Sequence, residues 1–124
     1  MIRVFHCDDS LAYRRLVRAM LETEPDIAIV GEAADHADAV TGVAAARPDI
    51  VLLDMVVGPP DAGFAPSLAA AAPGARVIIL SGHPPERVDP ELRAIAAAHV
   101  RKSTAFDELA RAVRSVAAES TNVQ

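Results

Sequence analysis

The sequence predicts an α/β fold: a single doubly wound (βα)5 domain with a five-stranded parallel sheet. Short apolar runs alternate five times with segments of helical periodicity along the whole chain. The apolar runs are continuous, which is typical of strands that are buried on both faces of a parallel sheet. The chain has 124 residues, 52% of them hydrophobic and 23% charged, which suits one globular domain with its own core.

The first half of the chain contains three strand patterns, rich in β-branched residues and leucine. A helical pattern lies between the first two, because apolar residues recur there at i, i+3 and i+4 until Pro25 interrupts them. A second helix is expected after Asp35, which is a plausible N-cap, and it ends before Pro48. The expected strands are 2–7, 27–30 and 49–53, and the second helix is expected over 36–46.

The second half contains two strand patterns and three helical ones. Residues 57–63 are rich in proline and glycine, so they are expected to form a loop. Pro84 and Pro85 oppose a helix directly after the fourth strand, whereas Asp89 followed by Pro90 is typical of a helix start. The expected strands are 76–80 and 99–101, and the expected helices are 64–72, 90–98 and a last one with an apolar face from Phe106 to Ala117.

The composition argues against several classes of protein. The chain has 12 basic and 17 acidic residues, and Lys102 is its single lysine, so nucleic acid is not expected as a direct partner. One cysteine rules out an internal disulfide and a multi-cysteine zinc site. We find neither a signal-peptide pattern nor an apolar run long enough to span a membrane. We therefore expect a cytoplasmic domain over 1–119 with no membrane partner, followed by a polar tail at 120–124.

Reactive side chains gather where four of the expected strands end. Asp8 and Asp9 follow the first strand, Asp54 the third, Ser81 the fourth and Lys102 the fifth. In an open α/β sheet these ends lie along one edge, where ligands bind. Three carboxylates repel one another there, so a hard divalent cation is expected, and Mg²⁺ suits oxygen ligands. This cluster of side chains can also accept a phosphoryl group. A carboxylate would be the nucleophile, and the lysine and serine would face the phosphoryl oxygens.

Four motifs surround these residues in order along the chain. They are Cys7-Asp8-Asp9-Ser10, Leu52-Leu53-Asp54-Met55, Ile79-Leu80-Ser81-Gly82-His83 and Val100-Arg101-Lys102. Over residues 2–118 the sequence resembles the response-regulator receiver domain of two-component signalling. Residues 30–33 are similar to receivers that usually precede a helix-turn-helix DNA-binding domain, although no such output domain is present in this chain. The resemblance implies the flavodoxin-like strand order 2-1-3-4-5.

The resemblance also implies a function in a phosphorelay. Asp54 would accept a phosphoryl group from a histidine kinase or a phosphotransfer protein, so the domain would catalyse only its own phosphorylation and dephosphorylation and is not otherwise an enzyme. Ser81 and Lys102 would contact the phosphoryl oxygens. The ligands of Mg²⁺ would be Asp8, Asp9, Asp54 and the carbonyl oxygen of Val56.

Phosphorylation is expected to change a surface made of the fourth helix, the fifth strand and the fifth helix. That surface would bind a downstream protein or a second copy of the chain. Ser81 and His99 are the expected switch residues, and His99 occupies a place where the family commonly has tyrosine or phenylalanine. The alternative for His99 is an ordinary surface residue.

Other interpretations are weighed against this one. A haloacid-dehalogenase phosphatase typically needs an aspartate where this chain has Val56, and the glycine motifs of nucleotide-binding folds are missing. A pseudo-receiver that acts only by protein contact stays the alternative, because the prolines of loop 57–61 are displaced from the family pattern. His6 and Cys7 are expected to pack in the core, with metal binding as the less favoured interpretation. The arginines at 14, 15 and 18 form either a solvated helix face or a docking site for a kinase.

Overall fold

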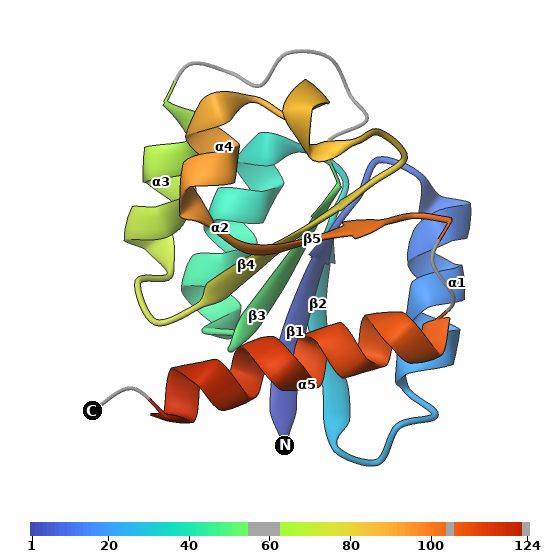
Figure 1. The fold of residues 1–124 in the computed structure, drawn as a ribbon. Coiled ribbons are helices and arrows are strands. Elements are labelled where there is room, and N and C mark those ends of the chain that lie inside the picture. Colours follow the sequence, from blue (N-terminus) through green and yellow to red (C-terminus); the bar gives the residue numbers. More distant parts are fainter. Residues whose placement is uncertain (55–62, 104–105, 123–124) are drawn as a thin grey trace.

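A computed structural model describes residues 1–54, 63–103 and 106–122, and it confirms the predicted fold class (Figure 1). Five parallel strands form one sheet in the order β2-β1-β3-β4-β5, which is the order that the sequence implied. The strands are β1 Ile2–Cys7, β2 Ile27–Ala33, β3 Ile50–Asp54, β4 Arg76–Ser81 and β5 Ala96–Arg101. The helices are α1 Leu11–Leu21, α2 His36–Ala46, α3 Phe64–Ala71, α4 Pro90–Ile95 and α5 Phe106–Asn122, with a 3-10 turn η1 at Pro85–Arg87.

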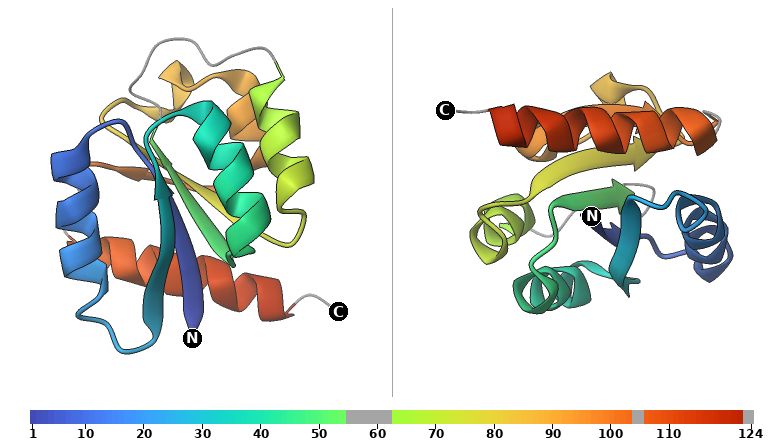
Figure 2. Two further views of the ribbon diagram at one scale, coloured as in Figure 1. Left: turned by 180° about the vertical axis from the view of Figure 1, so that it is seen from behind. Right: turned by 90° about the horizontal axis from the view of Figure 1, so that it is seen from below.

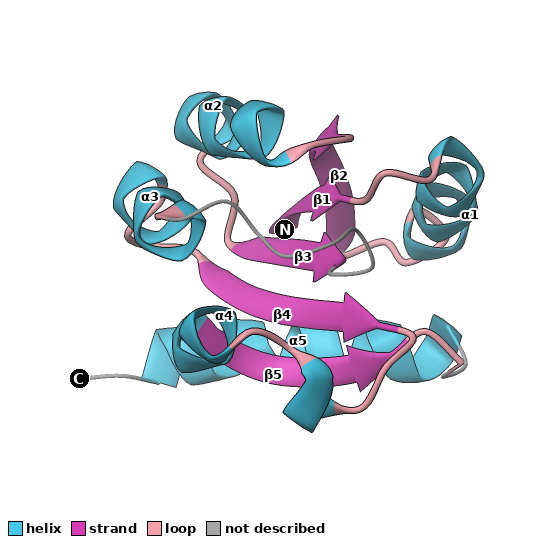
Figure 3. Ribbon diagram, turned by 90° about the horizontal axis from the view of Figure 1, so that it is seen from above, coloured by secondary structure: helices cyan, strands magenta, loops and turns pink. Residues whose placement is uncertain are grey.

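The sheet lies between two layers of helices (Figure 2). Helices α1 and α5 cover one face, where their apolar side chains form a core with Val4, Ile50 and Ile78. Helices α2, α3 and α4 cover the other face and form a second core with Phe5 and Val51. Figure 3 shows the twist of the sheet and the order of its strands from β2 to β5. Both faces of the strands are therefore buried, as their continuous apolar runs predict.

The helix starts follow from capping residues. The Asp35 carboxylate accepts a hydrogen bond from the backbone N–H of Asp38 at the start of α2, and the Ser10 hydroxyl accepts one from the N–H of Tyr13 at the start of α1. Asp89 caps α4, whose first residue is Pro90, as the sequence predicts. These caps fix the points where the chain leaves the carboxyl edge of the sheet.

Two strand boundaries differ from their predictions by three residues. Strand β2 continues beyond residue 30 to Ala33, because the backbone of Gly31 and Glu32 stays paired with β1 after a register shift. Strand β5 begins at Ala96 instead of 99, and α4 ends at Ile95 instead of 98. The alanines of 96–98 favour a helix in isolation, but pairing with β4 keeps them extended, so tertiary contacts override local propensity.

Smaller differences concern the ends of elements. Asp54 and Ser81 are the last residues of β3 and β4, whereas the sequence placed them just after these strands. Helix α5 continues to Asn122 and so includes part of the segment expected to be a polar tail. The division of the chain at residue 119 stays a prediction. The loop expected over 57–63 lies outside the described residues except for Gly63.

The ring of Phe5 fills space that two glycines leave open between β1, β2 and α2. A Cβ atom added at Gly31 would lie 2.7 Å from the ring, and one added at Gly42 would lie 2.5 Å from it. Phe5 is 2% exposed, so its ring is enclosed by the core and has little room to move. This packing brings α2 close to the sheet and holds β2 beside β1.

We predict that Gly42→Ala lowers the free energy of unfolding by about 1–3 kcal/mol, because the new methyl group overpacks the core against Phe5. The gain in helix propensity from alanine offsets only part of this cost. Urea denaturation of the variant measures the effect. Gly74→Ala is the matched control, because a Cβ atom at Gly74 meets nothing within 4 Å. An unchanged stability of Gly42→Ala would show that the ring moves aside freely.

Candidate functional site

Three strands deliver oppositely charged side chains to one point at the carboxyl edge of the sheet. Asp8 follows β1, Asp54 ends β3 and Lys102 follows β5. The Lys102 Nζ atom donates hydrogen bonds to Asp8 Oδ2 at 3.0 Å and to Asp54 Oδ2 at 2.7 Å. The single lysine of the chain therefore bridges the two carboxylates that the sequence predicted to face it.

The bridge is largely shielded from solvent. The side chains of Asp8 and Asp54 are 0% and 1% exposed, and that of Lys102 is 20% exposed. Burial raises the pKa of Asp54 to about 6, and the nearby charge of Asp8 acts in the same direction. The hydrogen bond from Lys102 opposes both effects. Burial alone would lower the pKa of Lys102. Its hydrogen bonds to Asp54 and Asp8 outweigh the effect of burial, so the pKa of Lys102 is raised.

Both carboxylate oxygens of Asp8 accept hydrogen bonds. Burial alone would raise its pKa, yet hydrogen bonds from the Ser10 backbone N–H and from Lys102 lower it. The Ser10 N–H donates to Asp8 Oδ1 at 2.8 Å, and the guanidinium of Arg14 donates to the Asp8 carbonyl at 2.6 Å. These contacts fix the turn between β1 and α1, so Asp8 is ionised and oriented before any ligand binds.

The three predicted acidic ligands lie close enough to share a cation. Ligand oxygens of Asp8, Asp9 and Asp54 all lie within 4.8 Å of one another, and Asp9 is exposed to solvent. Opposite ligands of Mg²⁺ are about 4.2 Å apart, so a small contraction of the group would be enough. All donors are hard oxygens, and the residues therefore fit Mg²⁺. The predicted fourth ligand, the Val56 carbonyl, lies outside the described residues.

Ser81 lies beside this group at the end of β4 and is 1% exposed. Its hydroxyl accepts a hydrogen bond from the backbone N–H of His83 at 3.0 Å. Its carbonyl accepts one from the backbone N–H of Lys102 at 2.8 Å. This hydrogen bond joins the end of β4 to the backbone that carries the bridging lysine.

The sequence profile of the response regulator receiver domain matches residues 4–114. This chain belongs to that family. The receiver domain is 35% identical over 122 residues to the DNA-binding transcriptional activator DevR/DosR of Mycobacterium tuberculosis, a match that covers 95% of this chain and 55% of the relative. It is 31% identical over 117 residues to the transcriptional regulatory protein LiaR of Bacillus subtilis, covering 93% of this chain and 56% of LiaR. The receiver domain thus spans about half the length of these relatives.

Solved structures agree with this assignment. The receiver domain of the putative response regulator NarL from Mycobacterium tuberculosis superposes with a TM-score of 0.81 at 31% identity, covering 94% of this chain and 95% of that one. CheY6 of R. sphaeroides, solved in complex with the P1 domain of CheA3, has a TM-score of 0.79 at 25% identity, covering 94% of this chain and 97% of that one. None of the helices in the described part of the receiver is both long and apolar enough to cross a membrane.

Tyr13 is a site residue that the sequence reasoning treated only as part of a helix face. The Lys102 Nζ atom lies 4.2 Å from the centre of the Tyr13 ring, which is a favourable cation–π position. The ring therefore covers the ammonium from the side of α1. A signal was present in the sequence, because Tyr13 lies in the first turn of the helix that follows Asp9. The pattern alone did not show which way the ring would point.

His6 and Cys7 face opposite sides of β1. Burial lowers the pKa of His6 to about 4, so its imidazole is neutral at pH 7. Burial raises the pKa of Cys7 to about 12, which leaves its thiol protonated and unreactive. Both are buried, as predicted, but the Nε2 atom of His6 lies only 3.9 Å from Asp8 Oδ2. His6 therefore borders the acidic group as well as the core.

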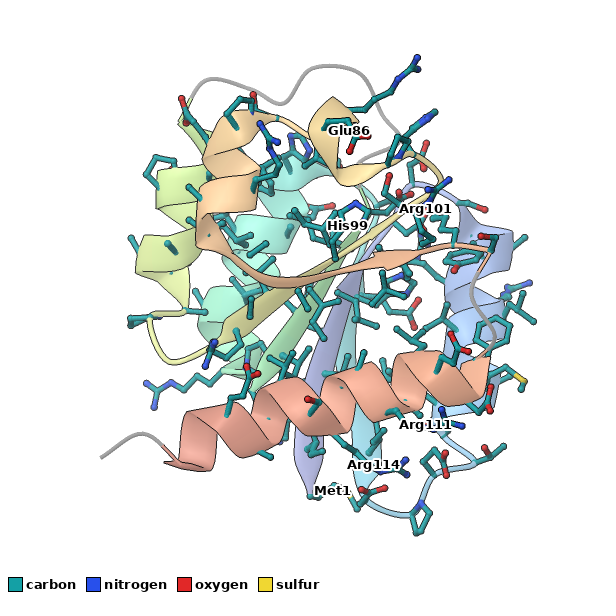
Figure 4. The ribbon with its side chains drawn as sticks, in the orientation of Figure 1. Met1, Glu86, His99, Arg101, Arg111 and Arg114 are labelled. Carbon is teal, nitrogen blue, oxygen red and sulfur yellow. The ribbon has the colours of Figure 1, made fainter. Side chains whose placement is uncertain are left out.

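His99 lies on β5 near Glu86 and Arg101, as Figure 4 shows. Partial burial and the charge of Arg101 lower its pKa, while Glu86 acts in the opposite direction. Its Nε2 atom is buried and has no hydrogen-bond partner within the described residues. This environment does not test a switch role, which stays a prediction.

The basic stretch of α1 divides into two parts. Arg14 and Arg18 bind the Glu32 carboxylate of β2, with nitrogen–oxygen distances of 3.2 and 2.6 Å. Arg15 is exposed. The ion pairs give Arg14 and Arg18 a structural role. Of these three arginines, Arg15 is left as the candidate for docking of a kinase.

We predict that protonation of His6 destabilises the receiver as the pH falls. Between pH 6.5 and 4 the unfolded chain binds a proton at His6 that the folded chain does not bind, so stability is lost as the pH drops. Relative to His6→Leu, the wild type should lose about 2 kcal/mol of unfolding free energy between pH 7 and pH 5. Asp54 has the opposite pH dependence, but it is present in both proteins and cancels in the comparison. Urea denaturation at both pH values measures the difference, and parallel curves would contradict the prediction.

Proposed function

We propose that this chain is a phosphoacceptor receiver, which takes a phosphoryl group onto Asp54 from a phosphohistidine of a histidine kinase or phosphotransfer protein. The observation that carries the proposal is the lysine bridge: one ammonium lies within hydrogen-bond distance of Asp8 and Asp54. Asp9 completes a group of three carboxylates at the same edge. This is a charge arrangement that accepts a dianionic phosphoryl group together with a divalent cation.

In the proposed reaction a carboxylate oxygen of Asp54 attacks phosphorus and the N–P bond of the donor breaks. An acyl phosphate forms, and the donor imidazole leaves with its electron pair and takes up a proton. With a pKa of about 6, Asp54 is mostly ionised at neutral pH and can act as the nucleophile. Lys102 and Ser81 would contact the phosphoryl oxygens. When bound by Asp8, Asp9 and Asp54, Mg²⁺ would neutralise charge on the transferred group.

The exposed face of α1 supports docking of the phosphodonor protein beside this site. Leu11, Leu16 and Met20 are 50%, 47% and 40% exposed, and Arg15 lies among them. Exposed methionine and arginine side chains of this kind are enriched at protein interfaces. The CheY6 structure, solved in complex with the P1 domain of CheA3, supports a domain of that kind as the class of partner.

The output would come from the α4-β5-α5 surface, which would bind a downstream protein or a second copy of the chain. Ser81 and His99 are the proposed switch residues. The hydrogen bond between the Lys102 N–H and the Ser81 carbonyl supports this role, because it joins the ends of β4 and β5.

We place the domain in the cytoplasm, where histidine kinases phosphorylate their partners. A pseudo-receiver that needs no phosphorylation is the alternative, and the altered loop that motivates it falls outside the described residues.

We predict that the wild-type chain, incubated with Mg²⁺ and acetyl phosphate, gains the mass of one phosphoryl group and that Asp54→Asn does not. The amide keeps the shape of the carboxylate but lacks the nucleophilic oxygen. Intact-mass spectrometry measures the adduct. Asp38→Asn, on the exposed part of α2, is the matched control and should be phosphorylated like the wild type. An adduct that persists in Asp54→Asn would disprove the assignment, and no adduct in the wild type would favour the pseudo-receiver.

We predict that Lys102→Arg slows phosphorylation by about tenfold or more, although it keeps the positive charge. The guanidinium is a planar fork and cannot replace a compact ammonium held 2.7 and 3.0 Å from two carboxylates. The rate of adduct formation from acetyl phosphate measures the effect. Arg101→Lys is the matched control, because this neighbouring side chain is exposed and the change should leave the rate unaltered. Equal rates for wild type and Lys102→Arg would show that only charge matters at this position.

A further inference from the structure

The Tyr13 side chain contacts the bridging lysine through the face of its ring. The Lys102 Nζ atom lies 4.2 Å from the ring centre, which is close enough for a cation–π attraction. The ring is partly buried and packs against the core that α1 and α5 form with the sheet. Such a contact is stronger where water is excluded, because the ammonium is then less well hydrated. Lys102 therefore has a third attachment besides the carboxylates of Asp8 and Asp54.

The position of this ring is fixed from two sides. The Tyr13 backbone N–H donates a hydrogen bond to the Ser10 hydroxyl at 3.1 Å, and the Ser10 N–H donates one to Asp8 Oδ1 at 2.8 Å. The ring also meets the buried imidazole of His6 in an edge-to-face arrangement, with 6.1 Å between the ring centres. The turn that orients Asp8 thus also places the ring, so little further ordering is needed for it to bind the ammonium.

The three attachments of Lys102 respond differently to a bound cation. Asp8 and Asp54 both belong to the acidic group that fits Mg²⁺. A cation bound by these carboxylates repels the ammonium, so the two hydrogen bonds from Lys102 become weaker. The Tyr13 ring carries no net charge, and its attraction for the ammonium is kept. Without the ring, the flexible four-carbon stem of the lysine would let the ammonium move into solvent.

We propose that Tyr13 is a positioning residue, which keeps the Lys102 ammonium beside Asp54 when a divalent cation occupies the acidic group. This role rests on the function proposed above, because the held ammonium is the one that would meet the phosphoryl oxygens at Asp54. A charge that is already in place does not have to be ordered during the reaction. The ring acts through Lys102 and makes no contact of its own with the phosphoryl group.

The single lysine makes this contact directly measurable. Tag-free protein labelled with ¹³C-lysine gives one set of lysine side-chain NMR signals, all from Lys102. Protons above the face of an aromatic ring resonate at lower frequency, so the ε-methylene signal reports whether the ammonium lies over Tyr13. In the wild type and in Tyr13→Phe, we expect this signal at lower frequency than in the urea-unfolded protein, both without Mg²⁺ and at saturating Mg²⁺. In Tyr13→Leu it should lie close to the position found in the unfolded protein.

The rate of adduct formation from acetyl phosphate at saturating Mg²⁺ measures the consequence for the reaction. We expect Tyr13→Leu to slow it about fivefold, and Tyr13→Phe to stay within about twofold of the wild type, because phenylalanine keeps the ring face. The Mg²⁺ concentration that gives half the maximal rate should change by less than about twofold, since the carboxylate ligands are unchanged. Phe106→Leu is the matched control, because it removes another partly buried ring that packs against the same core, and its rate should equal that of the wild type.

Several outcomes would overturn the proposal. A wild-type lysine signal that moves to its unfolded position when Mg²⁺ is added would show that the ring does not keep the ammonium. A wild-type rate in Tyr13→Leu would remove the positioning role, and an equal loss in Phe106→Leu or in Tyr13→Phe would assign the effect to packing or to the hydroxyl. A wild type that forms no adduct contradicts instead the function proposed for Asp54, and the lysine signal still decides whether Tyr13 holds the ammonium.

Discussion

The structure depends on one ammonium that holds two buried carboxylates together. Without Lys102, Asp8 and Asp54 would place like charges next to each other in a region of low polarity, and such charges strongly oppose joint ionisation. The bridge connects Lys102 to Asp54 and Asp8, which lie 48 and 94 positions earlier in the chain. It therefore ties β1, β3 and β5 together at one edge of the sheet. Burial keeps the pKa of Asp54 raised despite the hydrogen bond from Lys102, and the charge of Asp8 acts in the same direction as burial.

The charged part of the site was predictable because topology alone determines it. A parallel sheet brings the carboxyl ends of its strands to one edge, so Asp8, Asp54 and Lys102 meet once their strands are recognised. The contacts of Tyr13 and His6 depend on the direction of individual side chains, which periodicity does not specify. The boundary between α4 and β5 was missed for a related reason: a run of alanines carries little pattern, and only pairing with β4 decides its conformation.

Three of the eleven arginines make carboxylate contacts whose geometry differs from that of the one lysine. Arg114 binds both carboxylate oxygens of Asp26, at 2.8 and 2.9 Å, and thereby fastens α5 to the start of β2. Arg14 and Arg18 share the two oxygens of Glu32. The planar guanidinium suits such side-on contacts with a carboxylate. Lys102 instead places a compact charge between two separate carboxylates, a position that the fork of an arginine does not fit.

Strand β1 shows how one strand serves stability and chemistry at the same time. Phe5 and Cys7 face the α2 side and complete the core there, whereas His6 and Asp8 face the other side and bring polar atoms inside. An apolar residue in place of His6 would avoid the two nitrogens that have no hydrogen-bond partner within the described residues, so the histidine lowers the stability of the fold. The polar atoms that weaken this edge of the sheet therefore lie next to the acidic group that the proposed reaction uses.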